Sequence, residues 1–167
     1  MSNTALAREP AETIVSSPES TVPVTADRIL VIDDEPNICR LLQRYLSRLG
    51  YEVQIAGSVP EALEVLAGAR FDLVLTDLRL PGPSGLDLLV EVRSRSPGTR
   101  TILMSAHADV YAAAAAIERG VDQLIVKPFE LEDLRARVGD SLAKRRADRA
   151  AEEEREKLET RLRQRDT

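Results

Sequence analysis

Short apolar segments recur along the chain, and each is followed by a pattern typical of an amphipathic helix. The five apolar segments lie at residues 29–32, 53–55, 71–76, 101–104 and 124–126. A short apolar run that ends in polar or turn-forming residues is typical of a strand buried on both faces. Strands that alternate with helices at short intervals form a parallel sheet covered by helices on both faces. The alternation therefore predicts an α/β fold.

Residues that commonly begin and end helices stand between these apolar segments. Pro36 suits the first turn of the first helix, and Gly50 suits its C-terminal end. Ser58 and Glu61 have the spacing of a capping box at the start of the second helix. Asp109 is expected to cap the fourth helix. The chain thus offers boundaries for helices as well as strands.

The strand order follows from a rule of handedness. Connections between parallel strands are right-handed, which leaves few topologies for five strands and five helices. A flavodoxin-like order of 2-1-3-4-5 fits best, with the last helix extended. On the helices, three- and four-residue spacings predict which side chains face the core. Leu41 of the first helix and Val90 of the third are among them.

Composition narrows the class of protein. A hydrophobic content of 43% supports a real core, and a net charge of −5 gives no reason to expect nucleic-acid binding. No apolar run approaches the about 20 residues of a membrane helix, and no signal peptide is visible, which predicts a cytoplasmic protein. The one cysteine, Cys39, rules out an intramolecular disulfide. It falls in a helical pattern, so we expect a buried core thiol rather than a reactive one.

Three segments of different character divide the chain. Residues 1–27 have no sustained periodicity and are interrupted by prolines, which predicts a disordered N-terminal tail. Residues 28–142 contain the α/β pattern. Residues 143–167 continue the last helix, with nine basic and seven acidic side chains and a net charge of +2. Leu158 and Leu162 are four residues apart, so this segment is either a coiled-coil or signalling arm or a solvated helix held by charge pairs.

Polar residues follow the predicted strands at their carboxyl ends. Asp33 and Asp34 follow the first strand, Asp77 the third, Ser105 the fourth and Lys127 the fifth. In open α/β sheets, ligands bind outside the carboxyl ends of the strands. In the predicted order the first, third, fourth and fifth strands are neighbours, so these side chains converge on one edge.

Charge indicates what such a cluster can bind. Carboxylates that lie close together repel one another unless cations intervene. Lys127 supplies one positive charge, and an oxygen-rich site without placed Cys or His suits Mg²⁺ rather than zinc. The two cations would also neutralise a phosphoryl group, which makes Asp77 a candidate nucleophile and Ser105 a donor to a phosphoryl oxygen. The alternative is a salt-bridged cluster that only closes the edge of the sheet.

At these residues the sequence resembles the receiver domain of two-component response regulators. The matching pieces are Ile-Leu-Val-Ile-Asp-Asp-Glu-Pro at 29–36, Asp-Leu-Arg-Leu-Pro-Gly-Pro-Ser-Gly at 77–85, Met-Ser-Ala-His at 104–107 and Lys-Pro-Phe at 127–129. The resemblance covers about residues 28–142. It implies a switch that accepts a phosphoryl group on Asp77 from a histidine kinase or phosphotransfer protein.

The resemblance also implies roles for the other site residues. Asp34 and Asp77 would bind Mg²⁺ directly, Asp33 mainly through water, and the main-chain carbonyl of Arg79 would complete the protein ligands. Ser105 and Lys127 would contact the phosphoryl group. The bond between Lys127 and Pro128 is expected to be cis.

One position departs from the family pattern. Family members commonly have an aromatic residue three positions before the lysine, and Leu124 stands there. Leucine has no ring hydroxyl, so the usual coupling between the serine and the aromatic ring is in doubt. Arg79 and His107 stand where the family tunes the access of hydrolytic water. His107 is either a catalytic base or, as we expect, an exposed loop histidine.

The predicted function is a phosphoacceptor and not a turnover enzyme. A downstream protein would bind the face formed by the fourth helix, fifth strand and fifth helix, and the C-terminal helix could form a homodimer. The alternatives are a phosphorylation-independent interaction module and an aspartyl-phosphate phosphatase. Phosphatases that resemble haloacid dehalogenases carry a second acid two residues after the nucleophile, where this chain has Arg79.

Overall fold

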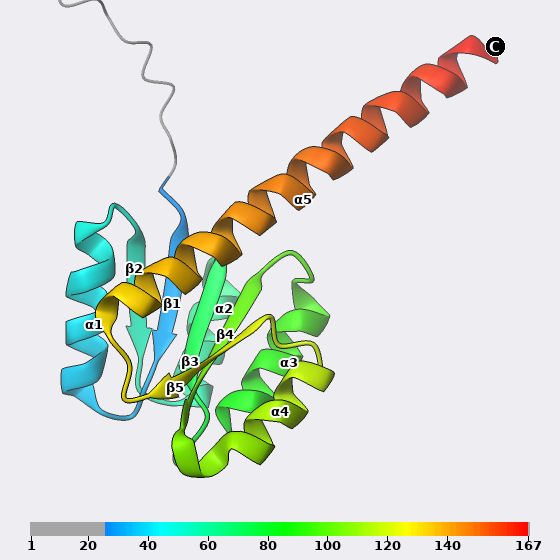
Figure 1. Ribbon diagram of the computed structural model, residues 1–167. Helices are drawn as coiled ribbons and strands as arrows, with labels where there is room; N and C mark the ends of the chain where they lie inside the picture. Colours follow the sequence, from blue (N-terminus) through cyan, green and yellow to red (C-terminus); the bar gives the residue numbers. More distant parts are fainter. Residues whose placement is uncertain (1–25, 167) are drawn as a thin grey trace, which may run out of the picture.

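A five-stranded parallel sheet forms the centre of the computed structural model, which describes residues 26–166 (Figure 1). The strands follow one another in the order β2-β1-β3-β4-β5. Their bounds are β1 Arg28–Ile32, β2 Glu52–Ala56, β3 Leu73–Asp77, β4 Arg100–Ala106 and β5 Gln123–Lys127. The predicted strand order is confirmed, and each predicted apolar segment lies within or overlaps one of these strands.

Helices cover both faces of the sheet (Figure 1). Their bounds are α1 Pro36–Arg48, α2 Val59–Gly68, α3 Gly85–Arg95, α4 Val110–Glu118 and α5 Leu131–Arg165, and the short 3-10 helix η1 His107–Asp109 precedes α4. One core cluster joins α1 and α5 to side chains such as Val31 and Leu75. The other joins α2, α3 and α4 to side chains such as Leu30 and Val74. Alternate residues of each strand thus supply opposite cores, as expected for strands buried on both faces.

Two predicted core residues lie at the surface instead. Leu41 is 53% exposed and Val90 is 40% exposed. On α1 the buried positions are Cys39, Leu42 and Leu46, and Leu41 is rotated by about 100° from its buried neighbour. Val90 has the same relation to buried Leu89. The predictions were wrong because adjacent leucines and valines satisfy a helical spacing equally well, and only packing against the sheet distinguishes them.

The helix boundaries agree with most of the sequence signals. The predicted capping box of α2 is half formed: Ser58 accepts a hydrogen bond from the amide of Glu61, but the Glu61 carboxylate accepts one from the amide of Gly57 and not from that of Ser58. Gly50 has a positive φ of 98°, which favours glycine at the end of α1. Asp109 occupies the N-cap position of α4, but among the described contacts its side chain binds Arg79 and not the helix amides. The predicted capping role is therefore wrong.

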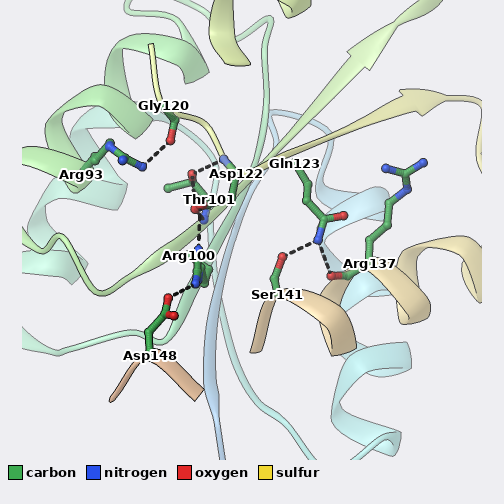
Figure 2. A network of polar contacts seen from close by, with 9 residues as sticks. All are labelled: Arg93, Arg100, Thr101, Gly120, Asp122, Gln123, Arg137, Ser141 and Asp148. Carbon is green, nitrogen blue, oxygen red and sulfur yellow. Dashed lines mark hydrogen bonds and ion pairs between the residues drawn. The ribbon is translucent and has the colours of Figure 1, made fainter. Parts of the chain in front are cut away.

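Helix α5 extends well past the sheet, and polar contacts hold its middle turns (Figures 1 and 2). Its buried apolar residues end at Leu142. Figure 2 shows polar contacts on either side of Leu142. Gln123 donates to Ser141, and Arg100 pairs with both Asp122 and Asp148. Two further ion pairs join Arg145 to Asp72 and Arg146 to Asp27. The helix is thus held at the amino ends of the strands as far as Asp148.

Two sequence predictions concern the ends of the chain and membrane helices. Residues 1–25 of the predicted N-terminal tail lie outside the described residues. Within residues 26–166, no helix combines the length and the apolar character that a membrane span requires.

Candidate functional site

Three aspartates meet at the carboxyl ends of β1 and β3. Asp33 and Asp34 directly follow β1, and Asp77 is the last residue of β3. One carboxylate oxygen from each lies within 4.8 Å of the others. Asp33 is buried, with 1% of its surface exposed, whereas Asp34 is exposed and Asp77 is half-buried. The sheet topology produces this cluster, because β1 and β3 are adjacent parallel strands that end at the same edge.

Lys127 bridges two of the three carboxylates. Its Nζ lies 2.6 Å from Oδ2 of Asp77 and 3.1 Å from Oδ2 of Asp33. Burial alone would lower the pKa of the ammonium group, but the hydrogen bonds that it donates to Asp77 and Asp33 outweigh burial and raise that pKa above the usual value. The ammonium group therefore stays charged and offsets part of the negative charge of the cluster. The Lys127–Pro128 peptide bond is cis, as expected.

Backbone amides fix the orientation of the same two carboxylates. Oδ1 of Asp33 accepts a hydrogen bond of 2.9 Å from the amide of Glu35. Oδ1 of Asp77 accepts one of 3.0 Å from the amide of Arg79. In each carboxylate, one oxygen thus accepts a hydrogen bond from Lys127 and the other accepts one from an amide of the loop that follows its own strand. Asp34 adds an exposed carboxylate beside them.

Ser105 lies close to the cluster in the fold but its hydroxyl is engaged elsewhere. It is fully buried on β4, one residue past Met104, which is the register partner of Asp77. Its Oγ donates to the carbonyl of Ala106 at 3.2 Å. The structure therefore brings the carboxylates and the lysine together as predicted, while the serine hydroxyl is turned toward its own backbone.

Arg79 and Asp109 form an ion pair beside the cluster that the sequence did not reveal. Nε and Nη2 of Arg79 lie 2.7 and 2.5 Å from the two carboxylate oxygens of Asp109. The hydrogen bonds from Arg79 hold the pKa of Asp109 below its usual value, and the pKa of Arg79 is raised in return. The two residues are 30 positions apart, so no local spacing could have predicted the contact.

Gly85 ends the motif matched at 77–85 but was given no role of its own, and in the structure it packs against the backbone of Asp77. As the first residue of α3, it packs so closely that a Cβ atom would lie 1.9 Å from the carbonyl oxygen of Asp77 and 2.9 Å from Oγ1 of Thr76. Its amide donates to the carbonyl of Leu78 at 3.0 Å. Ser84 and Asp87 form a capping box around this start of the helix. A glycine directly after a capping serine was the available sequence signal.

The remaining residues singled out in the sequence lie around the site. Leu124 packs, half-buried, against the core beneath α2, α3 and α4. His107 is exposed in η1, as expected. Cys39 is buried as predicted, its Sγ donates to the carbonyl of Asp33 at 3.2 Å, and burial raises the pKa of its thiol.

Comparison with known proteins gives the class of this domain. The sequence model of the response regulator receiver domain matches residues 29–139. The chain therefore belongs to the response regulator receiver domain family, and its fold and acidic edge are consistent with a phosphoacceptor role in two-component signalling.

Individual relatives agree with this family. The chain is 38% identical over 119 residues to response regulator protein PilR of Pseudomonas aeruginosa, which covers 71% of this chain and 27% of PilR. It is 38% identical over 108 residues to regulatory protein AtoC of Escherichia coli, which covers 65% of this chain and 23% of AtoC. The chain thus spans about a quarter of the length of these curated relatives.

Solved structures give the same fold. A response regulator receiver domain protein from Clostridium thermocellum superimposes with a TM-score of 0.69 at 30% identity, covering 72% of this chain and 98% of that one. A CheY-like receiver domain protein from Methanospirillum hungatei gives a TM-score of 0.71 at 29% identity, covering 74% and 99%.

The close contact at Gly85 predicts an effect of a single methyl group. Gly85→Ala should lower the free energy of unfolding by about 1–3 kcal/mol, because the new Cβ must displace the backbone of Asp77. Gly139→Ala in α5 is the matched control, since nothing lies within 4 Å of a Cβ there. It should raise stability by about 0.5–1 kcal/mol through helix propensity. Urea unfolding measures both, and equal effects of the two substitutions would contradict the close approach.

The raised pKa of Lys127 predicts a pH dependence. A group whose folded pKa exceeds the unfolded value of 10.5 stabilises the fold fully below that pH, and the stabilisation is lost as pH rises through the folded pKa. The stability difference between wild type and Lys127→Met should therefore be constant from about pH 7 to about pH 10 and shrink above it. Lys144→Met, on the exposed side of α5, is the control for the loss of a lysine that contacts neither Asp33 nor Asp77. If the stability difference between wild type and Lys127→Met stays constant above about pH 11, the ion pairs of Lys127 are contradicted.

Proposed function

We propose that Asp77 accepts a phosphoryl group from the phosphohistidine of a histidine kinase or phosphotransfer protein. One observation carries this proposal: Lys127 joins Asp33 and Asp77 while Asp34 stands within 4.8 Å of both. In the reaction, a carboxylate oxygen of Asp77 attacks phosphorus, the P–O bond forms, the P–N bond breaks, and the imidazole leaves and takes up a proton.

The donor set of the site fits magnesium. It offers carboxylate oxygens, and it leaves Asp34 exposed, which suits a hard cation that keeps several waters. Asp34 and Asp77 would bind Mg²⁺ directly, Asp33 through water, and the carbonyl of Arg79 from the main chain. The bound ion would supply positive charge against the incoming phosphoryl group.

The chain's own residues would perform the other tasks. Lys127 holds its ammonium group on Asp77 and would contact a phosphoryl oxygen there. The amide of Arg79 orients the acceptor carboxylate. Ser105 would turn its hydroxyl from the carbonyl of Ala106 to a phosphoryl oxygen, which requires a local change where β4 leads into η1.

The phosphorylated protein would act as a switch and not as a turnover enzyme. Arg79 occupies the position where a phosphatase of the haloacid dehalogenase type carries its second acid, so hydrolysis would be slow autodephosphorylation. Phosphorylation would shift a two-state equilibrium and alter the face made by α4, β5 and α5. Exposed Tyr111 and Ile117 on α4, 92% and 47% exposed, suit a downstream protein on this face.

We propose three segments: a tail over 1–27, a receiver domain over 28–142 and a helical arm over 143–167. The contacts of Arg145, Arg146 and Asp148 with the sheet support an arm that begins rigidly attached. A cytoplasmic location stays a prediction from the sequence.

The acceptor assignment predicts the result of a phosphotransfer experiment. Incubation with acetyl phosphate and Mg²⁺ should add one phosphoryl group to the wild type and none to Asp77→Asn, because the amide cannot act as the nucleophile. Asp140→Asn, an exposed position on α5, is the matched control and should be labelled like the wild type. Intact-protein mass spectrometry measures the labelling. Unchanged labelling of Asp77→Asn would refute the assignment.

The arm predicts a change in oligomeric mass. Leu158 and Leu162 are 49% and 62% exposed, and we propose that a second copy of the chain covers them when the receiver is activated. Light scattering with Mg²⁺ and beryllofluoride, a phosphoryl mimic, should then show a higher mass for the wild type than for a Leu158→Lys, Leu162→Lys variant. Hydrogen exchange on α4, β5 and α5 in the same samples tests the proposed output face. If wild type and variant have equal masses with and without beryllofluoride, a dimer formed through Leu158 and Leu162 is ruled out.

A further inference from the structure

The ion pair between Arg79 and Asp109 spans the two loops that border the phosphoacceptor site. Arg79 lies in the loop that joins β3 to α3, and Asp109 ends η1, directly before α4. The contact is bidentate, with distances of 2.7 and 2.5 Å. The two ends differ in exposure, since the side chain of Arg79 is 79% exposed and that of Asp109 is 10% exposed. The guanidinium group therefore lies in solvent, whereas the carboxylate of Asp109 is largely covered while the pair is intact.

Arg79 is tethered next to the acceptor. It stands two residues past Asp77, and its amide donates to Oδ1 of the Asp77 carboxylate at 3.0 Å. The ion pair also borders a shallow surface hollow, whose other lining residues are Leu78, Leu80, Ser84 and Ala112. The long side chain thus has open space beside it and an acceptor carboxylate within its own loop.

Asp109 stands at a helix start that it does not cap. It is the N-cap residue of α4, yet its φ of −102° and ψ of 18° differ from the extended backbone usual for a cap. Both of its carboxylate oxygens are bound to Arg79. The same side chain therefore has two alternative partners, the guanidinium group and the first amides of α4, and in this structure the guanidinium group holds it.

We propose that Arg79 exchanges partners on phosphorylation, leaving Asp109 for the phosphoryl group on Asp77, and that the released Asp109 then caps α4. The proposal rests on the proposed function. A phosphoryl group carries a charge of about −1.5 to −2 and three strong acceptor oxygens, so it competes well with one carboxylate for a bidentate guanidinium group. The released carboxylate of Asp109 would lie at the start of α4, where no side chain caps the first amides and these amides can donate to it.

This exchange offers a link between site and helix that does not use an aromatic ring. Asp109 follows Ser105 by four residues, on the segment that joins β4 to α4. Leu124 has no polar group with which to respond to a turn of the Ser105 hydroxyl. The ion pair joins the acceptor loop to the start of α4 directly, so Asp109 is a positioning residue whose side chain acts through Arg79.

A set of variants of the full chain separates the two halves of the exchange. Asp109→Asn removes the charge that holds Arg79 but keeps a side chain that caps a helix well, whereas Asp109→Ala removes both functions. Arg79→Gln removes the guanidinium group. The double variant Arg79→Gln, Asp109→Asn completes a double-mutant cycle for the two residues. Glu118→Gln, at the far end of α4, is the control for a lost negative charge on the same helix.

The first readout is the dissociation constant for beryllofluoride in the presence of Mg²⁺. Both Asp109 variants should bind roughly two- to fivefold more tightly than the wild type, because the competitor for Arg79 is gone. Arg79→Gln should bind more weakly, and adding Asp109→Asn to it should change nothing. Glu118→Gln should match the wild type. The advantage of Asp109→Asn should also shrink as NaCl is raised, because an exposed ion pair is screened.

The second readout is hydrogen exchange of the first-turn amides of α4. Without beryllofluoride these amides should exchange more slowly in Asp109→Asn than in the wild type, and no more slowly in Asp109→Ala, which cannot cap. Beryllofluoride should slow their exchange in the wild type. A purely structural role of Asp109 would instead make both variants exchange faster.

The outcomes distinguish this proposal from the proposed function. Absent binding of beryllofluoride, or equal binding by Asp77→Asn, would refute the phosphoacceptor function and the exchange with it. Binding that depends on Asp77, together with an effect of Asp109→Asn that persists in the Arg79→Gln background, would refute the exchange alone.

Discussion

The ammonium group of Lys127 is the interaction on which the acidic edge of this domain depends. Asp33 is buried and Asp77 is half-buried, and their carboxylates lie close enough for their charges to repel. A lysine that binds both, at 3.1 and 2.6 Å, neutralises part of this charge and holds β1, β3 and β5 together at their carboxyl ends. The remaining negative charge is open to solvent at Asp34. The lysine therefore offsets part of the charge of the edge, and the exposed carboxylate of Asp34 is left for the proposed cation.

The sheet topology brings these groups together, and the two opposite ends of the sheet serve different purposes. At the carboxyl end, short loops present carboxylates, amides and the exposed guanidinium group of Arg79 to solvent. At the amino end, Asp72 and Arg100 are paired with residues of α5, which ties the long helix to the strands. Directional polar contacts thus join α5 to the amino-end side of β3 and β4, in addition to apolar packing.

Particular residues show where sequence reasoning succeeded and where it failed. Asp33, Asp77 and Lys127 could be assigned to one edge because each follows an apolar strand, and parallel strands end together. Leu41 and Val90 were assigned wrongly, because a helical spacing does not identify which of two adjacent apolar residues faces the sheet. Asp109 was expected to cap α4 by local chemistry, and a partner 30 residues away took its carboxylate instead.

The sequence by itself determined the α/β class, the strand order, the set of polar residues at the strand ends and the family, because these depend on local periodicity and on the few topologies that parallel strands permit. Only the tertiary structure decided which groups are in contact: the pairing of Arg79 with Asp109, the close approach of Gly85 to Asp77, the turned hydroxyl of Ser105 and the ion pairs that hold α5 beyond Leu142. The ion pairs join residues far apart in the chain, whereas the contacts of Gly85 and Ser105 are local. All of them depend on backbone positions within a few ångströms that no spacing along a sequence encodes.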